Sequence, residues 1–137
     1  MSNESYQRPP IIVAEHEHER LTGLALSALD HTPGAVDLFA ELSRAATMKT
    51  LPETVVSVGS VATFEFDGSF YRDYELVDPH RADIAQRRIS VLTPVGAMLL
   101  GLSEGQSIGW VGPDERAHRV VVERVRPRGV NTNAAAT

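Results

Sequence analysis

The chain has 137 residues, of which 42% are hydrophobic, and a formal net charge of −5; this predicts one domain with a substantial core and argues against a broad basic surface for nucleic acid. It contains no cysteine, which excludes disulfides, thiol catalysis and thiolate metal sites. The first residues lack the pattern of a signal peptide and no apolar stretch approaches the ~18 residues of a membrane span, so we expect a cytoplasmic protein.

The first half of the chain predicts helices. Pro9 and Pro10 close a polar segment, residues 1–10, that we expect to be a flexible tail, and the short apolar run Ile11–Val13 follows. Residues 14–29 carry apolar side chains at three- and four-residue spacing, which is typical of an amphipathic helix. These side chains are Leu21, Leu24, Ala25 and Ala28.

A second helix is expected after the break at residues 31–34. Thr32 is a favourable N-cap residue, Pro33 suits the first helical position, and the helix should run to about Met48. Its expected inner face consists of Val36, Phe39, Leu42 and Ala46. Because the loop is so short, the two helices must lie antiparallel, and two helices of about 15 residues make a hairpin about 22 Å long. We assign this hairpin to residues 11–50.

The second half, residues 51–128, predicts a sheet. Its segments are rich in β-branched residues and alternate in polarity, and Asp67-Gly68 is a strong two-residue hairpin turn. The expected strands are residues 55–66, 70–77, 89–92, 107–111 and 118–125. Residues 78–88 are polar and suggest an exposed loop, and we expect residues 129–137 to be a disordered tail.

One short helix interrupts this sheet. In the stretch "ISVLTPVGAMLLGLSEGQSIGW", Thr93 can cap a helix, Pro94 can start it, and Gly101 can end it in a left-handed conformation. The helix between them, Val95–Leu100, is too short and too apolar to stand alone. We therefore expect it to plug the open end of a strongly curved antiparallel sheet, with Leu99 or Leu100 buried.

The segment "RISVLTPVGAMLLGLSEGQSI" resembles the C-terminal signature of the GreA/GreB transcription elongation factors. The matching positions are Arg88, Ile89, Ser90, Thr93, Pro94, Leu99, Leu100, Glu104, Gly105 and Gln106. The segments "VSVGSVATFEFDG" and "YELVDP" are similar to strands of the same family. The short hairpin and the start "PPIIV" are closer to the Rnk group, the regulators of nucleoside diphosphate kinase.

This resemblance implies an α+β fold in which a short antiparallel helical hairpin, or coiled coil, precedes an FKBP-like curved antiparallel sheet with one short helix. Proteins of this type dock on the rim of the RNA polymerase secondary channel. In Gre factors, acidic residues at the hairpin tip hold a catalytic magnesium ion and stimulate cleavage of backtracked RNA. The Rnk branch is similar in docking, but its hairpin is too short to reach. An indirect effect on nucleoside diphosphate kinase levels is implied.

Four residues are candidates for contact with the polymerase. Thr93 and Pro94 lie where Gre factors resemble one another most, and Asp30 and Asp37 lie near the hairpin loop. The Gre tip places an aspartate and a glutamate three residues apart, and no such pair occurs in this loop. Ordinary solvated charge is therefore the alternative for Asp30 and Asp37, and we expect no catalytic residue, metal or cofactor.

Other chemistries have weaker support. In "EHEHER", His16 and His18 are two residues apart and point to different helix faces, so a solvated first turn is favoured over a metal site. No serine lies in a nucleophile elbow. The arginine-rich end could either bind an acidic partner or protect a sheet edge, and it consists of Arg116, Arg119, Arg124, Arg126 and Arg128. Arg124 and Arg126 share one face of the strand.

The sequence therefore predicts a non-enzymatic transcription regulator that binds RNA polymerase at its secondary channel and competes with Gre factors. We expect no sequence-specific contact with nucleic acid and none with membranes. The alternative is a peptide-binding or weakly prolyl-isomerising domain of FKBP type. Such an activity needs an aromatic-lined pocket, and the single tryptophan, Trp110, is better explained as a core residue.

Overall fold

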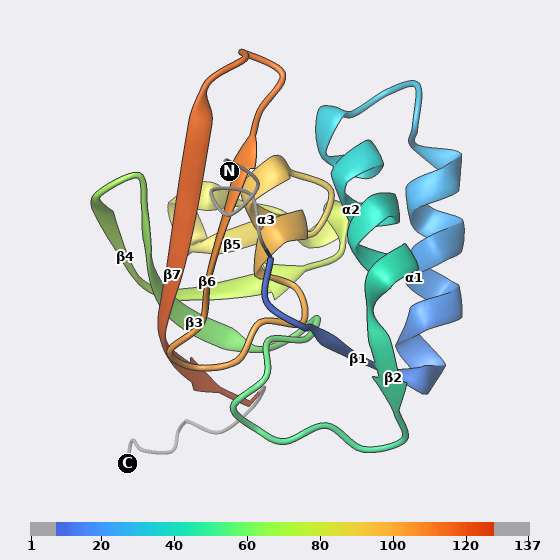
Figure 1. Ribbon diagram of the computed structural model, residues 1–137, viewed down its shortest axis with the longest axis horizontal. Coiled ribbons are helices and arrows are strands. Elements are labelled where there is room, and N and C mark those ends of the chain that lie inside the picture. Colours follow the sequence, from blue (N-terminus) through green and yellow to red (C-terminus); the bar gives the residue numbers. More distant parts are fainter. Residues whose placement is uncertain (1–7, 128–137) are drawn as a thin grey trace, which may run out of the picture.

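The computed structural model describes residues 8–127, which form a helical hairpin packed beside a five-stranded sheet (Figure 1). The hairpin consists of α1 (Glu15–Ser27) and α2 (Pro33–Arg44), and the short helix α3 (Pro94–Leu99) lies between α2 and the sheet. The α+β fold is confirmed. The expected tails, apart from residues 8–10, lie outside the described residues. Within residues 8–127 no helix is long and apolar enough to cross a membrane.

The two long helices pack through small and branched side chains. Leu21 and Ala25 of α1 are fully buried, as expected, and so are Ala35, Leu38 and Leu42 of α2. The predicted inner face of α2 is therefore wrong in part. Val36 is 58% exposed and Phe39 is 38% exposed, because the buried face of α2 must serve both α1 and α3.

The second helix ends at Arg44 rather than near Met48. Residues Ala46–Met48 form strand β2, which pairs in parallel with β1 (Ile12–Ala14). The Ala46 amide donates to the Ile11 carbonyl oxygen at 3.0 Å. The residue that follows α2, Ala45, has extended backbone angles, so this pairing replaces the final helical turn expected from the sequence.

The main sheet has the strand order β5-β4-β3-β7-β6. Its strands are β3 (Val61–Phe66), β4 (Ser69–Val77), β5 (Arg88–Ser90), β6 (Ser107–Val111) and β7 (Ala117–Arg126). The predicted turn at Asp67-Gly68 is confirmed, with φ angles of 51° and 87° that suit a two-residue hairpin. Residues 55–60, expected to extend the first strand, form no ladder. Val55 makes an isolated bridge with Ser103, and the amides of Val56 and Gly59 donate to the carbonyl oxygens of Leu102 and Leu76.

The expectation of a purely antiparallel sheet is wrong at one edge. Strand β5 pairs in parallel with β4, with Leu76 opposite Ile89. The connection between them is not a plain loop: it contains two short 3₁₀ turns, Pro79–Arg81 and Ile84–Gln86. These turns return the chain to the level of Glu75 in β4, where β5 begins at Arg88, so that β5 runs in the same direction as β4.

Helix α3 is an internal element, as expected. Leu99 and Leu100 are both 2% exposed, and Gly101 follows with a φ of 85°. Two glycines allow the close packing around it. A Cβ atom on Gly96 would lie 2.1 Å from the Ser90 carbonyl oxygen, and one on Gly34 of α2 would lie 1.9 Å from that of Leu92. The hairpin therefore packs directly against the segment that leads into α3.

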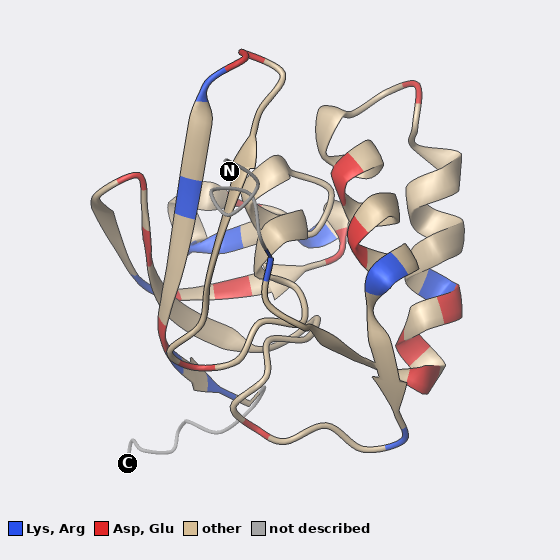
Figure 2. Ribbon diagram, in the orientation of Figure 1, with Lys and Arg blue, Asp and Glu red and all other residues tan. Residues whose placement is uncertain are grey.

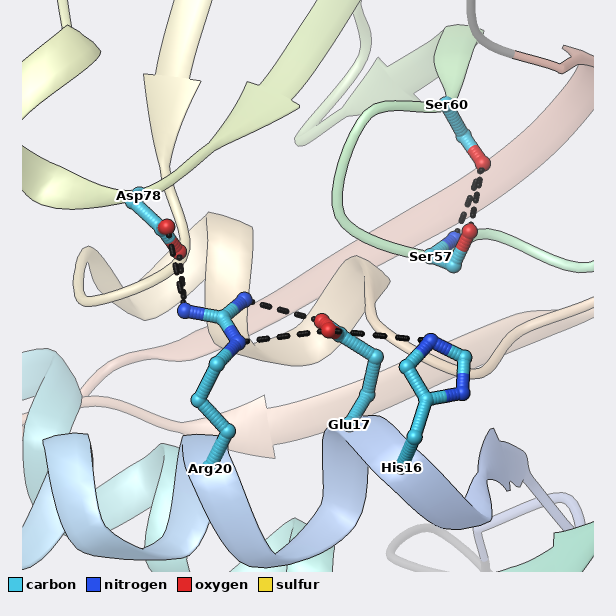
Figure 3. A network of polar contacts seen from close by, with 6 residues as sticks. All are labelled: His16, Glu17, Arg20, Ser57, Ser60 and Asp78. Atoms are coloured by element: carbon cyan, nitrogen blue, oxygen red, sulfur yellow. Dashed lines mark hydrogen bonds and ion pairs between the residues drawn. The ribbon is translucent and has the colours of Figure 1, made fainter.

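Polar contacts join the hairpin to the end of β4 and also occur within the segments around it. Arg20 of α1 donates to Glu17 and to both carboxylate oxygens of Asp78, at the end of β4, at 3.0 and 3.2 Å (Figure 3). In the same region, Ser60 Oγ accepts a hydrogen bond from the Ser57 amide (Figure 3). On the other helix, the buried carboxylate of Glu41 is paired with Arg8 and Arg44.

Candidate partner-binding site

Thr93 and Pro94 form a rigid start to α3. The Thr93 hydroxyl donates to the Ser90 carbonyl oxygen at 2.8 Å and accepts from the Gly96 amide at 3.0 Å. Pro94 occupies the first helical position, where its fixed φ is favourable. Thr93, Pro94 and Val95 are half-buried, whereas residues 96–99 are buried. These three residues, the α3 corner below, are therefore the part of α3 that a partner can touch.

A large apolar cavity lies on one side of the α3 corner. Its volume is about 390 Å³, and Thr93 and Val95 form part of its wall. The other apolar lining side chains are Phe64, Phe66, Tyr71, Ala82, Ile84 and Ile89, and Asp83 and Arg88 also border the cavity. Phe64 and Tyr71 are stacked with their ring centres 5.1 Å apart. Ile84 is 64% exposed at the rim, so the cavity can receive an apolar side chain from outside.

A smaller cavity of about 250 Å³ lies on the other side, and Pro94 forms part of its wall. It is also lined by Phe66, Trp110, Gly112, Pro113, Asp114 and His118. Phe66 belongs to both cavities, so the α3 corner stands between two apolar hollows. Trp110 is 3% exposed, which confirms it as a core residue.

A histidine bound to two carboxylates closes one side of the smaller cavity. His118 Nδ1 lies 2.6 Å from Asp67 Oδ2, and Nε2 lies 3.1 Å from both carboxylate oxygens of Asp114. These hydrogen bonds, Asp67 first and Asp114 second, raise the pKa of His118. Burial pushes the pKa of Asp67 upward, but the bonds from His118 and from the Arg119 amide outweigh it and the net pKa is lowered.

The two predicted acidic residues have different surroundings. Asp30 is exposed in the loop that follows α1. Asp37 is half-buried on α2, where burial raises its pKa, the charge of Arg8 opposes that rise and the charge of Glu41 adds to it. Asp37 therefore belongs to the polar cluster around Glu41, and the structure gives no shared environment to Asp30, Asp37 and the α3 corner.

The remaining charged candidates differ in their contacts. His16 is exposed and lies 3.9 Å from Glu17, whereas His18 Nε2 contacts the Leu42 carbonyl oxygen at 2.8 Å. Among residues 8–127 no group of three or more His, Asp or Glu side chains is placed to hold a metal ion. Strand β7 pairs with β6 only as far as Val121, so at Arg124 and Arg126 its one ladder partner among the described strands is β3, and protection of a sheet edge stays a prediction. Arg126 is paired with Asp73 at 3.0 Å.

Charge is distributed without a dominant sign. Acidic and basic segments are interspersed over the sheet and the helical hairpin (Figure 2). The α3 corner and its cavities are instead dominated by aromatic, aliphatic and proline side chains. These cavities and the pairing of His118 were not predicted from the sequence. The alternation of Phe64, Phe66 and Tyr71 across a predicted hairpin was the one signal that could have indicated an aromatic wall.

Comparisons with known proteins agree with this architecture. The family model "Transcription elongation factor, GreA/GreB, C-term" matches residues 51–127, and "Rnk N-terminus" matches residues 9–46. The regulator of nucleoside diphosphate kinase of Escherichia coli K12 is 38% identical over 111 residues, covering 77% of this chain and 81% of that protein. The protein of the same name from Shigella flexneri has the same values.

A solved structure extends the agreement to the fold. The prokaryotic transcription elongation factor GreA/GreB from Nitrosomonas europaea is 35% identical and superposes with a TM-score of 0.65. The match covers 87% of this chain and 99% of that one. Because the family models together include both the hairpin and the sheet, the chain belongs to the GreA/GreB family, in the branch of the regulators of nucleoside diphosphate kinase.

Proposed function

We propose that this protein is a non-enzymatic transcription regulator that binds RNA polymerase at the rim of the secondary channel. The observation that carries the proposal is the α3 corner. It lies within the family signature, it is held rigid by the Thr93 cap, and it is flanked by two apolar cavities. The two apolar cavities beside this corner can receive apolar side chains of a partner. Such a regulator works in the cytoplasm, and its effect on nucleoside diphosphate kinase levels is indirect.

Competition with Gre factors follows from the size of the hairpin. Helices α1 and α2 have 13 and 12 residues, which correspond to about 20 Å of helix. The hairpin of a Gre factor is roughly twice as long. The protein therefore occupies the docking site without delivering acidic residues to the catalytic centre. Asp30 and Asp37 are at most contacts with the channel wall in this proposal.

A binding titration tests the docking site. We expect Pro94→Ala to lower the affinity for core RNA polymerase by about fivefold, because the variant removes apolar contact at the centre of the surface. The fold should be retained, since proline is favourable but not essential at the first helical position. Pro52→Ala is the matched control, because Pro52 is exposed and lines neither cavity. Equal affinities for the wild type and Pro94→Ala would refute this docking site.

The larger cavity favours a second candidate function, that of an FKBP-type peptide-binding or weakly prolyl-isomerising domain. Its support is the aromatic wall of Phe64, Phe66 and Tyr71 beside a curled sheet with a buried short helix. An isomerisation assay with a proline-containing peptide separates the two functions. Turnover that is lost in Phe66→Ala would favour the second function, whereas polymerase binding without turnover supports the first.

A further inference from the structure

The environment of His118 is unusual because both ring nitrogens face a carboxylate. Nδ1 lies 2.6 Å from Asp67, and Nε2 lies 3.1 Å from Asp114. The side chain of His118 is only 19% exposed. A neutral imidazole carries one N–H and can donate to one of the two carboxylates, whereas the imidazolium ion donates to both. The complete arrangement therefore requires a protonated ring.

The three side chains connect two separate turns of the sheet. Asp67 lies in the β3–β4 turn, where its Oδ1 also accepts from the Arg119 amide at 2.9 Å. Asp114 lies in the β6–β7 turn, where its Oδ1 also accepts from the Arg116 amide at 3.1 Å. The His118 ring stacks on Phe66, with 5.8 Å between ring centres, and lies 5.6 Å from Trp110. The two turns are thus held together over the aromatic floor of the smaller cavity.

The backbone leaves room for this arrangement at Gly112. A Cβ atom at that position would lie 3.0 Å from Asp114 Oδ1 and 3.0 Å from His118 Cδ2. Any side chain at Gly112 must therefore push the carboxylate or the ring aside. This offers a way to disturb the Asp114–His118 contact without changing a charge.

Few other charges act on the ring. The β6–β7 turn also contains Glu115 and Arg116, and Arg116 acts on Asp67 through its charge. Arg119, the neighbour on β7, directs its guanidinium to Ser107 at 2.8 Å. The floor residues Phe66 and Trp110 and the facing Pro94 are uncharged. Asp67 and Asp114 therefore dominate the protonation of His118.

We propose that His118 is a positioning residue that acts as a proton-dependent latch on the smaller cavity, holding the β6–β7 turn in the shape that docks the polymerase beside Pro94. The inference rests on the proposed function, because Pro94, Asp114 and His118 line the same cavity. When the ring loses its proton, one of the two carboxylates loses its donor. The hydrogen bonds between Asp67 and the backbone of Arg119 still join the β3–β4 turn to β7, but the β6–β7 turn loses a side-chain bond that fixes its shape, and the docking surface changes with it.

The direction of the pH dependence follows from the pKa shifts. The pKa of His118 is raised in the folded protein, so the latch is complete below about pH 6.5, the pKa of a free histidine, and is lost as pH rises through the higher folded value. The pKa of Asp114 is lowered, by the Arg116 amide first and by His118 second. The carboxylate side of the latch therefore fails only in acid.

Fluorescence of Trp110 reports directly on the latch, because it is the sole tryptophan of the chain. We expect its emission to titrate between about pH 5 and pH 9, with a midpoint above that of free histidine. Asp114→Asn should lower the midpoint, and His118→Gln should abolish the transition. Gly112→Ala should lower the midpoint without changing any charge. His31→Gln, in the exposed hairpin loop, is the control. A transition that persists in His118→Gln, or a midpoint unchanged in Asp114→Asn, would overturn the latch.

Affinity for core RNA polymerase, measured at both ends of the titration, tests the role in docking. We expect the affinity of wild type and of His31→Gln to fall between the acidic and the alkaline end by about three- to tenfold more than the affinity of His118→Gln. This factor is the effect of one charge-assisted hydrogen bond. A constant ratio between wild type and His118→Gln would refute a role in docking. If wild type fails to bind at every pH, the proposed function falls, and the fluorescence titration alone decides whether the latch exists.

Discussion

Glu41 is the most buried charged side chain of the hairpin, with 1% of its surface exposed. Its carboxylate is paired with Arg8 and is 2.8 Å from Arg44 Nη2, and Arg44 also donates to the Pro9 carbonyl oxygen at 2.8 Å. The three side chains fix the segment that leads into β1 against α2. A buried carboxylate is tolerated here because two guanidinium groups compensate for the loss of water.

At the residue scale, we expect Glu41→Gln to lower the free energy of unfolding by about 3 kcal/mol, because it leaves two half-buried arginines without their countercharge. Denaturant unfolding at neutral pH measures the effect. Glu19→Gln on the exposed face of α1 is the matched control and should stay within about 0.5 kcal/mol of wild type. Equal losses in the two variants would show that Glu41 contributes no more than a surface carboxylate.

The residues of the candidate site were only partly predictable. Thr93 and Pro94 carry a local signal, because threonine and proline at the start of an apolar run predict a capped helix. Beyond the alternation of Phe64, Phe66 and Tyr71, the cavity walls have no local signal, and the latch has none. Asp67 and His118 are 51 residues apart and meet only through the register of β3 on β7, and hydrophobic alternation does not specify which polar side chains such a register brings together.

At the element scale, the packing of α2 on α3 depends on Gly34. We expect Gly34→Ala to destabilise the protein by about 1–3 kcal/mol, because the added methyl group would meet the backbone of Leu92 and Thr93 rather than a side chain that can move away. Thermal or denaturant unfolding tests this expectation directly.

Gly23→Ala is the matched control for Gly34. Gly23 lies within α1, is exposed, and has no atom within 4 Å of an added Cβ. Alanine should therefore stabilise the helix, by about 0.5–1 kcal/mol. Opposite signs for the two substitutions support the packing described here, and a Gly34→Ala variant as stable as Gly23→Ala would contradict it.

Local patterns predicted most elements but not their contacts. Helix starts at Pro33 and Pro94, the turn at Asp67-Gly68 and the helix stop at Gly101 were all predictable, because each depends on the conformational preference of one or two residues. The early end of α2 was not, because it depends on β1, a partner more than 30 residues away. Val36 and Phe39 were wrongly predicted to be buried. Apolar periodicity does not indicate that small residues such as Gly34 and Ala35 form the closest contacts of α2.

At the scale of the whole molecule, the hairpin is short and packs on the body of the protein mainly through α2 against α3. Contacts at Gly34, the pairing of Arg20 with Asp78 and the hydrogen bond from the Ile12 amide to the Gly101 carbonyl oxygen hold it to the body of the protein. Its loop offers Asp30 but no pair of carboxylates at a spacing suited to one metal ion. A second ion must be fixed near the first for two-metal phosphoryl chemistry, so we expect docking without catalysis.

The most direct measurement is cleavage of labelled RNA in a backtracked elongation complex, with and without a Gre factor. We predict no stimulated cleavage by this protein alone and a progressive slowing of Gre-stimulated cleavage as its concentration rises. Pro94→Ala should compete less well. Cleavage stimulated by this protein alone, and lost in Asp30→Asn or Asp37→Asn, would contradict the account and make the acidic residues of the hairpin catalytic.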